Sequence, residues 1–217
     1  MINNDADFFG SLNFVSRGGQ KLDKALKLFN VSPEGKVCID CGASTGGFTD
    51  CLLQNGAKMV YAIDVGYGQL AWTLRNDPRV ITMERTNIRY VTPDMLTVKP
   101  DFAVIDVSFI SLKLVLPVIY NLLIEISEVI CLIKPQFEAG KTKVGKNGVV
   151  RDPETHKEVL HAFLKNAADS SFKVQAITHS PLRGPKGNIE FLGYLTTKGE
   201  CKQLDIDEIV DLSHNEI

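Results

Sequence analysis

Several ionisable side chains in this sequence stand where apolar, strand-like runs end. Asp106 closes the run Val-Ile-Asp, and Lys134 closes the run Cys-Leu-Ile-Lys. Lysine is rarely buried without a partner, so we expect Lys134 to pair with an acid, and Asp106 on the neighbouring predicted strand is the candidate. Such a pair suits general acid–base chemistry, in which a positioned group moves a proton. A purely structural ion pair fits the same pattern.

A glycine-bearing segment over residues 40–48 has the composition of a ligand-binding loop. It reads Asp-Cys-Gly-Ala-Ser-Thr-Gly-Gly-Phe, a G-x-x-x-G-G pattern that follows an apolar run. Glycines let the backbone approach a ligand, and the helix N-terminus that follows offers free N–H groups. The spacing differs from the G-x-G-x-x-G of dinucleotide sites, which disfavours a pyrophosphate. A plain turn that requires small residues is the alternative. The candidate cofactor-binding residues of this segment are Asp40, Gly42, Ala43, Ser44, Thr45, Gly46, Gly47 and Phe48.

Two further polar residues extend this candidate site. Asp64 ends the run Tyr-Ala-Ile-Asp about 20 residues after the glycine segment, where an acid can bind the ribose hydroxyls of a nucleoside-containing cofactor. Asn87 follows the next short strand and could hydrogen-bond an adenine edge. Ligands bind at the carboxyl ends of parallel strands, where we also expect Asp106. A solvated acid at a strand end is the alternative for Asp64.

The elements that position these residues alternate along the chain. A helix beginning at Ser16 precedes the first strand, and Asp152 with Pro153 has the pattern of a helix N-terminus. Alternation predicts an α/β fold, a Rossmann-like parallel sheet with helices on both faces. The strands at 172–178 and 189–196 are expected to form a C-terminal antiparallel hairpin, as in the seven-stranded sheet of S-adenosylmethionine-dependent methyltransferases. The remaining expected elements are strands at 36–41, 59–64, 80–83, 102–107 and 128–133, helices at 48–54, 69–75 and 112–124, and a long loop at 135–151.

Composition indicates a cytoplasmic globular protein. With 217 residues, 44% hydrophobic and 23% charged, the chain fits one large domain. We expect a lead-in over residues 1–13, an α/β domain over 14–200 and an acidic tail over 201–217. No apolar run is long enough to span a bilayer, and the N-terminus does not have the pattern of a signal peptide. The five cysteines are expected to be reduced thiols, and Cys38 and Cys41 are not expected to bind a metal.

The distribution of charge points to an anionic partner more clearly than the net charge does. A formal net charge of −2 argues weakly against a nucleic-acid substrate. Residues 134–151, however, hold five basic side chains against Glu138 alone. Basic groups in loops suit RNA phosphates, and a solvated flexible loop is the alternative. The candidate RNA-binding residues are Lys141, Lys143, Lys146, Arg151, Arg183 and Lys186.

Five ordered motifs, together spanning about residues 14–198, carry a resemblance to a known family. They are Ser-Arg-Gly-Gly-Gln-Lys-Leu, Asp-Cys-Gly-Ala-Ser-Thr-Gly-Gly-Phe-Thr-Asp, Asp-Val-Ser-Phe-Ile-Ser, Ile-Lys-Pro-Gln-Phe-Glu and Gly-x-x-Arg-Asp-Pro. The chain resembles the TlyA family of ribosomal RNA 2′-O-methyltransferases, within the broader FtsJ-like group and often labelled "hemolysin A". The resemblance implies S-adenosylmethionine as cofactor and ribosomal RNA or ribosomal subunits as partner, with cytidine ribose as the methylated group.

The resemblance also implies a lysine-aspartate-lysine-glutamate catalytic tetrad, which falls on Lys21, Asp106, Lys134 and Glu190. By sequence logic alone, Lys21 and Glu190 are more often surface charges. In the mechanism we expect, Lys134 accepts the proton of the ribose hydroxyl, and Lys21 orients the hydroxyl or the phosphate. Family members usually carry an S4-like RNA-binding domain before these motifs. Because only residues 1–13 precede them here, we expect weaker autonomous RNA binding.

Three other functions remain open at this point. The substrate could be another RNA or a small molecule, which the basic loops oppose only weakly. The domain could bind the cofactor without being active alone. A membrane-active hemolysin is opposed by the lack of a spanning segment and of a strongly amphipathic basic helix.

Overall fold

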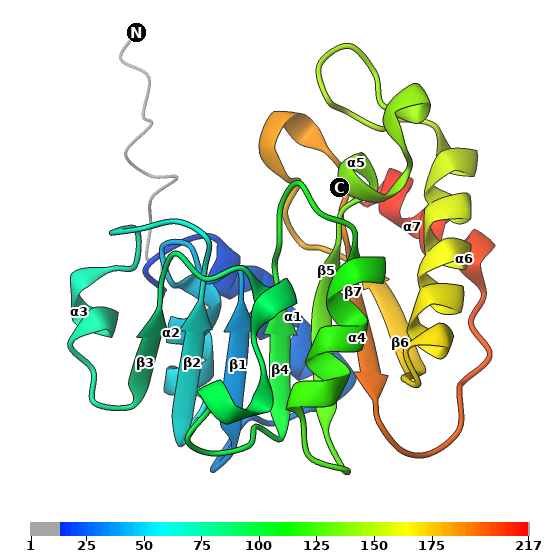
Figure 1. Ribbon diagram of the computed structural model, residues 1–217. Helices are drawn as coiled ribbons and strands as arrows, with labels where there is room; N and C mark the ends of the chain where they lie inside the picture. Colours follow the sequence, from blue (N-terminus) through cyan, green and yellow to red (C-terminus); the bar gives the residue numbers. More distant parts are fainter. Residues whose placement is uncertain (1–13, 217) are drawn as a thin grey trace, which may run out of the picture.

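The computed structural model describes residues 14–216 and contains a seven-stranded mixed sheet (Figure 1). The expected lead-in over residues 1–13 lies outside the described residues. The strands follow the order β3-β2-β1-β4-β5-β7-β6. β7 pairs antiparallel with both β5 and β6, and the other pairings are parallel. The expected α/β sheet with a C-terminal antiparallel hairpin is confirmed. The strands are β1 (Val37–Cys41), β2 (Met59–Ile63), β3 (Val80–Met83), β4 (Phe102–Ile105), β5 (Glu128–Ile133), β6 (Lys173–His179) and β7 (Phe191–Thr196).

Helices cover both faces of the sheet and enclose two hydrophobic cores. One core packs α1 and α2 against the sheet, and the other packs α4, α6 and α7 against the opposite face. In Figure 1, α4 and α6 lie in front of the sheet, and α1 and α2 lie behind it. The helices are α1 (Gly18–Phe29), α2 (Gly47–Gln54), α3 (Trp72–Arg75), α4 (Leu112–Leu122), α5 (Pro135–Glu138), α6 (Pro153–Asp169) and α7 (Ile206–Asn215).

Local sequence explains where these elements begin and end. All five residues of β1 are buried, as expected for a strand covered on both faces. The Asp152 side chain accepts a hydrogen bond from the backbone N–H of Thr155, so the predicted cap of α6 is confirmed. Ser111 caps α4 in the same way. Asn30, in the left-handed conformation, ends α1.

Two segments contain helices where the sequence predicts none. The expected loop at 135–151 begins with the short helix α5, and residues 201–217, expected as a tail, contain α7. Asp205 caps α7, while Ile206 and Val210 are buried in the core beside α6 and β6. Five acids are interspersed among the apolar residues of this segment, and they obscure the apolar face that holds α7 on the domain.

The strand directions bring the candidate site residues to one edge of the sheet. The parallel strands end at the upper edge in Figure 1, and β7 begins there because it runs the opposite way. Ile133 at the end of β5 pairs with Phe191 at the start of β7. Lys134 and Glu190, the next residues outward, therefore lie side by side, although Glu190 precedes its strand and Lys134 follows its own.

Within residues 14–216, no helix is long and apolar enough to cross a membrane.

Candidate active site

A cavity of about 640 Å³ opens at the carboxyl ends of β1, β2 and β4. Its volume lies within the range of about 300–1,000 Å³ that is usual for small-molecule sites. Five of the predicted cofactor-binding residues line it together. They are Gly42, Ser44, Asp64, Asn87 and Asp106.

Gly42 brings the backbone of the glycine segment against β4. Its φ is +89°, and a Cβ at this position would lie 2.4 Å from the carbonyl oxygen of Asp106. Any other residue would push the two strand ends apart. The predicted need for glycine at this position therefore has a direct steric reason.

Asp64 organises the rim of the same cavity. One carboxylate oxygen accepts a 2.8 Å hydrogen bond from the backbone N–H of Ser44, and the other accepts a 2.7 Å bond from Gly66. Asn87 also lines this cavity. Its Oδ1 accepts a hydrogen bond from the backbone N–H of Arg89, which fixes the orientation of the amide group. Carboxylate and amide groups in these places suit the hydroxyls and the base edge of a nucleoside.

The other predicted cofactor residues have different surroundings. Ala43, Thr45, Gly47 and Phe48 line a second cavity, described next. Gly46 has a φ of +98°, and a Cβ there would collide with Leu74. Glycine is therefore required at this position for the turn that leads into α2. Asp40 is fully buried and lines neither cavity. Its Oδ2 accepts a 2.6 Å bond from Thr49 Oγ1, and burial raises its pKa to about 7.

The second cavity, of about 600 Å³, adjoins the first and contains all four residues of the implied tetrad. Lys134 Nζ lies 2.5 Å from Asp106 Oδ1 and donates a 3.1 Å hydrogen bond to Ser108 Oγ. Lys21 Nζ lies 2.6 Å from Glu190 Oε2. The expected partnership of Lys134 and Asp106 is present, and Asp106 borders both cavities. We call these four side chains the ion-pair cluster.

The glutamate of the cluster is the most enclosed of the four. Its side chain has no exposed surface, and Gln136 Nε2 donates a 3.0 Å bond to Glu190 Oε1. A Cβ on Gly184 would lie 2.1 Å from the same oxygen. A buried carboxylate needs such charged and hydrogen-bonded partners, and they fix the direction in which it faces Lys21.

Sequence reasoning missed several residues of the site. Ser108 and Gln136 touch the cluster and lie within two of the quoted motifs, but their residue types alone do not indicate a role before the fold is known. Phe109 lines the first cavity, is 90% exposed and has a φ of +64°. A bulky residue with positive φ is uncommon, and such strain is concentrated at functional sites.

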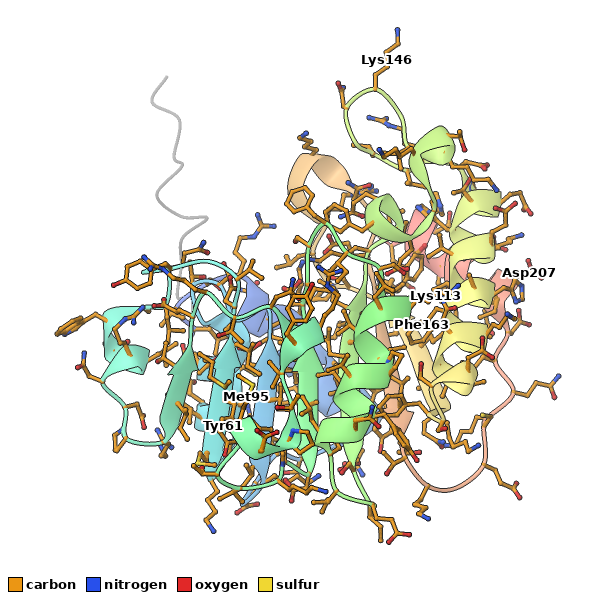
Figure 2. The ribbon with its side chains drawn as sticks, viewed as in Figure 1. Tyr61, Met95, Lys113, Lys146, Phe163 and Asp207 are labelled. Atoms are coloured by element: carbon orange, nitrogen blue, oxygen red, sulfur yellow. The ribbon has the colours of Figure 1, made fainter. Side chains whose placement is uncertain are left out.

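The candidate RNA-binding residues differ in their surroundings. Arg183 and Lys186 line the second cavity. Lys143 forms an ion pair with Glu158 on α6. Lys141 is exposed, and Figure 2 shows Lys146 pointing away from the molecule at the tip of its loop.

The cysteines provide no shared site. Cys38 packs in the core on one face of the sheet and Cys41 in the core on the other. Among residues 14–216 no group of three or more histidine, cysteine, aspartate or glutamate side chains could hold a metal ion.

The order of the seven strands and the helices on both faces give this protein the fold of S-adenosylmethionine-dependent methyltransferases. A solved methyltransferase of this class from Aquifex aeolicus shares it at 16% sequence identity, with a TM-score of 0.58 over 85% of this chain and 95% of that one. At such low identity the likeness concerns the fold alone.

Residues 14–196 match the FtsJ-like methyltransferase family, and the chain belongs to that family. The Bacillus subtilis protein YqxC is 57% identical over 88% of this chain and 69% of its own length. The TlyA protein of Mycobacterium tuberculosis, named a 16S/23S rRNA (cytidine-2′-O)-methyltransferase, is 45% identical over 94% of this chain and 76% of its own. A solved structure from Streptococcus thermophilus, named as a hemolysin, has a TM-score of 0.92 and 49% identity over 96% of this chain and 77% of that one.

Proposed function

We propose that this enzyme transfers a methyl group from S-adenosylmethionine to the 2′-hydroxyl of a cytidine ribose in ribosomal RNA. The observation that carries the proposal is the ion-pair cluster, which borders the nucleoside-sized cavity through Asp106. The activity named for the Mycobacterium tuberculosis relative supports the choice of substrate. Its place of action would be the cytoplasm, where ribosomal subunits are found.

The first cavity has the features that S-adenosylmethionine requires. Gly42 lets the ends of β1 and β4 approach at the cavity wall, Asp64 offers a carboxylate to ribose hydroxyls, and Asn87 offers an amide to the base. When bound, this cofactor supplies an electrophilic methyl group on a sulfonium. Asp106, at the border of the two cavities, provides negative charge on the side where that cation would lie.

The side chains of the cluster would prepare the hydroxyl for attack. A ribose hydroxyl is a weak nucleophile and needs a base. The neutral amine of Lys134, formed when Nζ gives up one of its own protons to solvent, accepts the hydroxyl proton as the oxygen takes the methyl group from the sulfonium. Asp106 and Ser108 hold the amine in place. Lys21, fixed by Glu190, orients the hydroxyl or the adjoining phosphate. The exposed Lys141 and Lys146 and the cavity residues Arg183 and Lys186 hold the RNA backbone.

Methyl transfer from radiolabelled S-adenosylmethionine to unmethylated ribosomal subunits tests the proposal. We expect the wild-type protein to label the rRNA, and Lys134→Ala to reduce the rate by about 10²–10⁴-fold, the usual contribution of general acid–base catalysis. Cofactor affinity, measured by calorimetry, should change little. Lys113→Ala is the matched control, because Lys113 is exposed on α4 (Figure 2).

Each outcome has a distinct meaning. Label from wild type but not from Lys134→Ala supports both the reaction and the base. Cofactor binding without any label would refute rRNA methylation by this chain alone. Absence of both binding and label would refute the assignment of the first cavity.

A further inference from the structure

A third cavity lies beside the ion-pair cluster. It encloses about 340 Å³ and shares Arg183 and Lys186 with the second cavity. Its other walls come from two more segments, the loop before α6 with Val150 and Arg151, and α7 with His214. In Figure 1 these segments gather at the same edge of the sheet as the site. The second cavity therefore shares wall residues with both the first and the third.

The third cavity is lined by charge of one sign. Arg151, Arg183 and Lys186 are positive, and no acid is among the described residues that line it. Like charges around one space repel each other, and a cleft of one sign concentrates counter-ions. Occupation by an anion would relieve this repulsion.

Buried hydrogen bonds hold the two loops of this cavity together. Asn188, only 2% exposed, accepts a 3.0 Å bond at Oδ1 from the backbone N–H of Val150. Its Nδ2 donates a 3.0 Å bond to the carbonyl oxygen of Gly148. The basic groups therefore project from a preformed wall, so little ordering is needed when a ligand binds.

α7 contributes a further donor to the same space. His214 Nε2 lies 2.9 Å from Nδ1 of His156, which is fully buried in α6. Burial lowers the pKa of His156 to about 4, so this ring is neutral near pH 7. In the tautomer in which its Nδ1–H donates to Nε2 of His214, the ring of His214 carries its own proton on Nδ1 and can donate that N–H to a ligand.

We propose that the third cavity binds a phosphodiester group of the RNA strand beside the target nucleotide, through Arg151, Arg183, Lys186 and His214. This inference rests on the proposed function and adds to it a defined place for the neighbouring nucleotide. The order of the cavities supports it. The cofactor cavity shares Asp106 with the cavity of the cluster, where the ribose would react, and that cavity shares Arg183 and Lys186 with the basic cavity.

Binding of unmodified rRNA transcripts at several salt concentrations, together with methyl-transfer kinetics, tests the inference. Arg151→Ala should weaken binding about tenfold, as for a hydrogen bond to a charged group. It should also lower the slope of log affinity against log salt by about 1. KM for RNA should rise while kcat at saturating RNA stays near the wild-type value, because these groups do not touch the reacting atoms.

The matched variants separate this role from a structural one. His214→Ala should weaken binding, and His214→Gln, which keeps a donor, should restore part of the loss. Arg151→Ala combined with His214→Ala should cost less than the product of the two effects, since both contact one phosphate. Lys165→Ala, an exposed lysine on α6, is the control. If His214→Ala destabilises the fold, the exposed Arg151 decides the question alone.

The result also distinguishes the two proposals. An active wild type with unchanged affinity and KM in Arg151→Ala would overturn the phosphate site and leave the methyl transfer intact. Salt-dependent RNA binding that needs Arg151, without methyl transfer by wild type, would support the phosphate site and overturn the reaction.

Discussion

Asp40 is an acid that the fold encloses completely. Burial is the main cause that raises the pKa of this carboxyl to about 7. The hydrogen bond from Thr49 opposes the rise, and the nearby Asp106 adds to it. The folded chain therefore keeps a proton on Asp40 at pH values where the unfolded chain has lost it.

Stability should fall as pH rises through this window. The carboxyl ionises near pH 4 in the unfolded chain and near pH 7 in the folded chain. The free energy of unfolding therefore falls by about 4 kcal/mol between these pH values. Asp40→Asn should abolish this loss, so that the variant gains about 4 kcal/mol over wild type on going from about pH 4 to about pH 8. Urea unfolding of the cofactor-free protein at both pH values measures it.

Asp211→Asn, an exposed acid on α7, is the control for this experiment. An equal difference between Asp40→Asn and wild type at both pH values would contradict the assignment of a protonated Asp40.

Single residues at strand ends could be predicted from sequence, and residues that meet only in the fold could not. Asp106 and Lys134 each follow a buried strand, which is visible in the pattern of apolar residues. Lys21 and Glu190 are 169 positions apart, and nothing local marks them as partners. Their place came from the resemblance, and the distance between them from the structure.

At the scale of elements, α6 and α7 are joined by the pair His156 and His214. Burial is the main cause that lowers the pKa of His156 to about 4, and the nearby His214 lowers it further. The unfolded histidine takes up a proton near pH 6.5, whereas the folded one resists until near pH 4. Acid therefore favours release of this contact.

His156→Gln should reduce the sensitivity of this protein to acid. As the pH falls from about 7 to about 4, His156 should lower the free energy of unfolding of the wild type by about 3 kcal/mol. The variant should not show this decrease. Chemical unfolding along that range, compared with the exposed His161→Gln on the same helix, measures the difference. Parallel pH curves for wild type and His156→Gln would argue against a neutral buried His156.

Most elements from β1 to β5 were predictable because apolar runs mark the strands, and glycine, proline or asparagine residues mark where elements end. The seven strands appear where apolar runs predict them, within two residues at either end. The helix expected at 69–75 covers only Trp72–Arg75, because the preceding residues form the loop around Asp64. α7 was not predicted because acids are interspersed among its apolar residues, and the burial of those apolar residues depends on α6 and β6.

At the scale of the whole molecule, the net charge of −2 conceals a separation of charge. The basic loop after α5 and the β6–β7 loop lie at the edge that holds the cavities (Figure 1). Acids of α7, among them Asp207, Glu208 and Asp211, lie on the helix that closes the domain. RNA would meet the basic edge, so the net charge is a poor guide to this partner.

The lysines of the basic loop should differ in their contribution to RNA binding. Lys141→Ala and Lys146→Ala should each lower the salt slope of rRNA affinity by about 1. Lys143→Ala should lower it less, because Lys143 already pairs with Glu158. Filter binding over a range of salt gives the slopes. Identical slopes for all three variants and wild type would show that this loop stays in solvent.

The contact between Lys21 and Glu190 has a consequence for how the enzyme is made. Every residue that lines the cofactor cavity has been translated once Leu114 is added, but Glu190 comes only just before the final strand. Chains fold from the N-terminus during synthesis, so a growing chain can assemble its cofactor cavity while the carboxylate that holds Lys21 does not yet exist. A nascent chain of this enzyme therefore lacks the complete ion-pair cluster until Glu190 has been added.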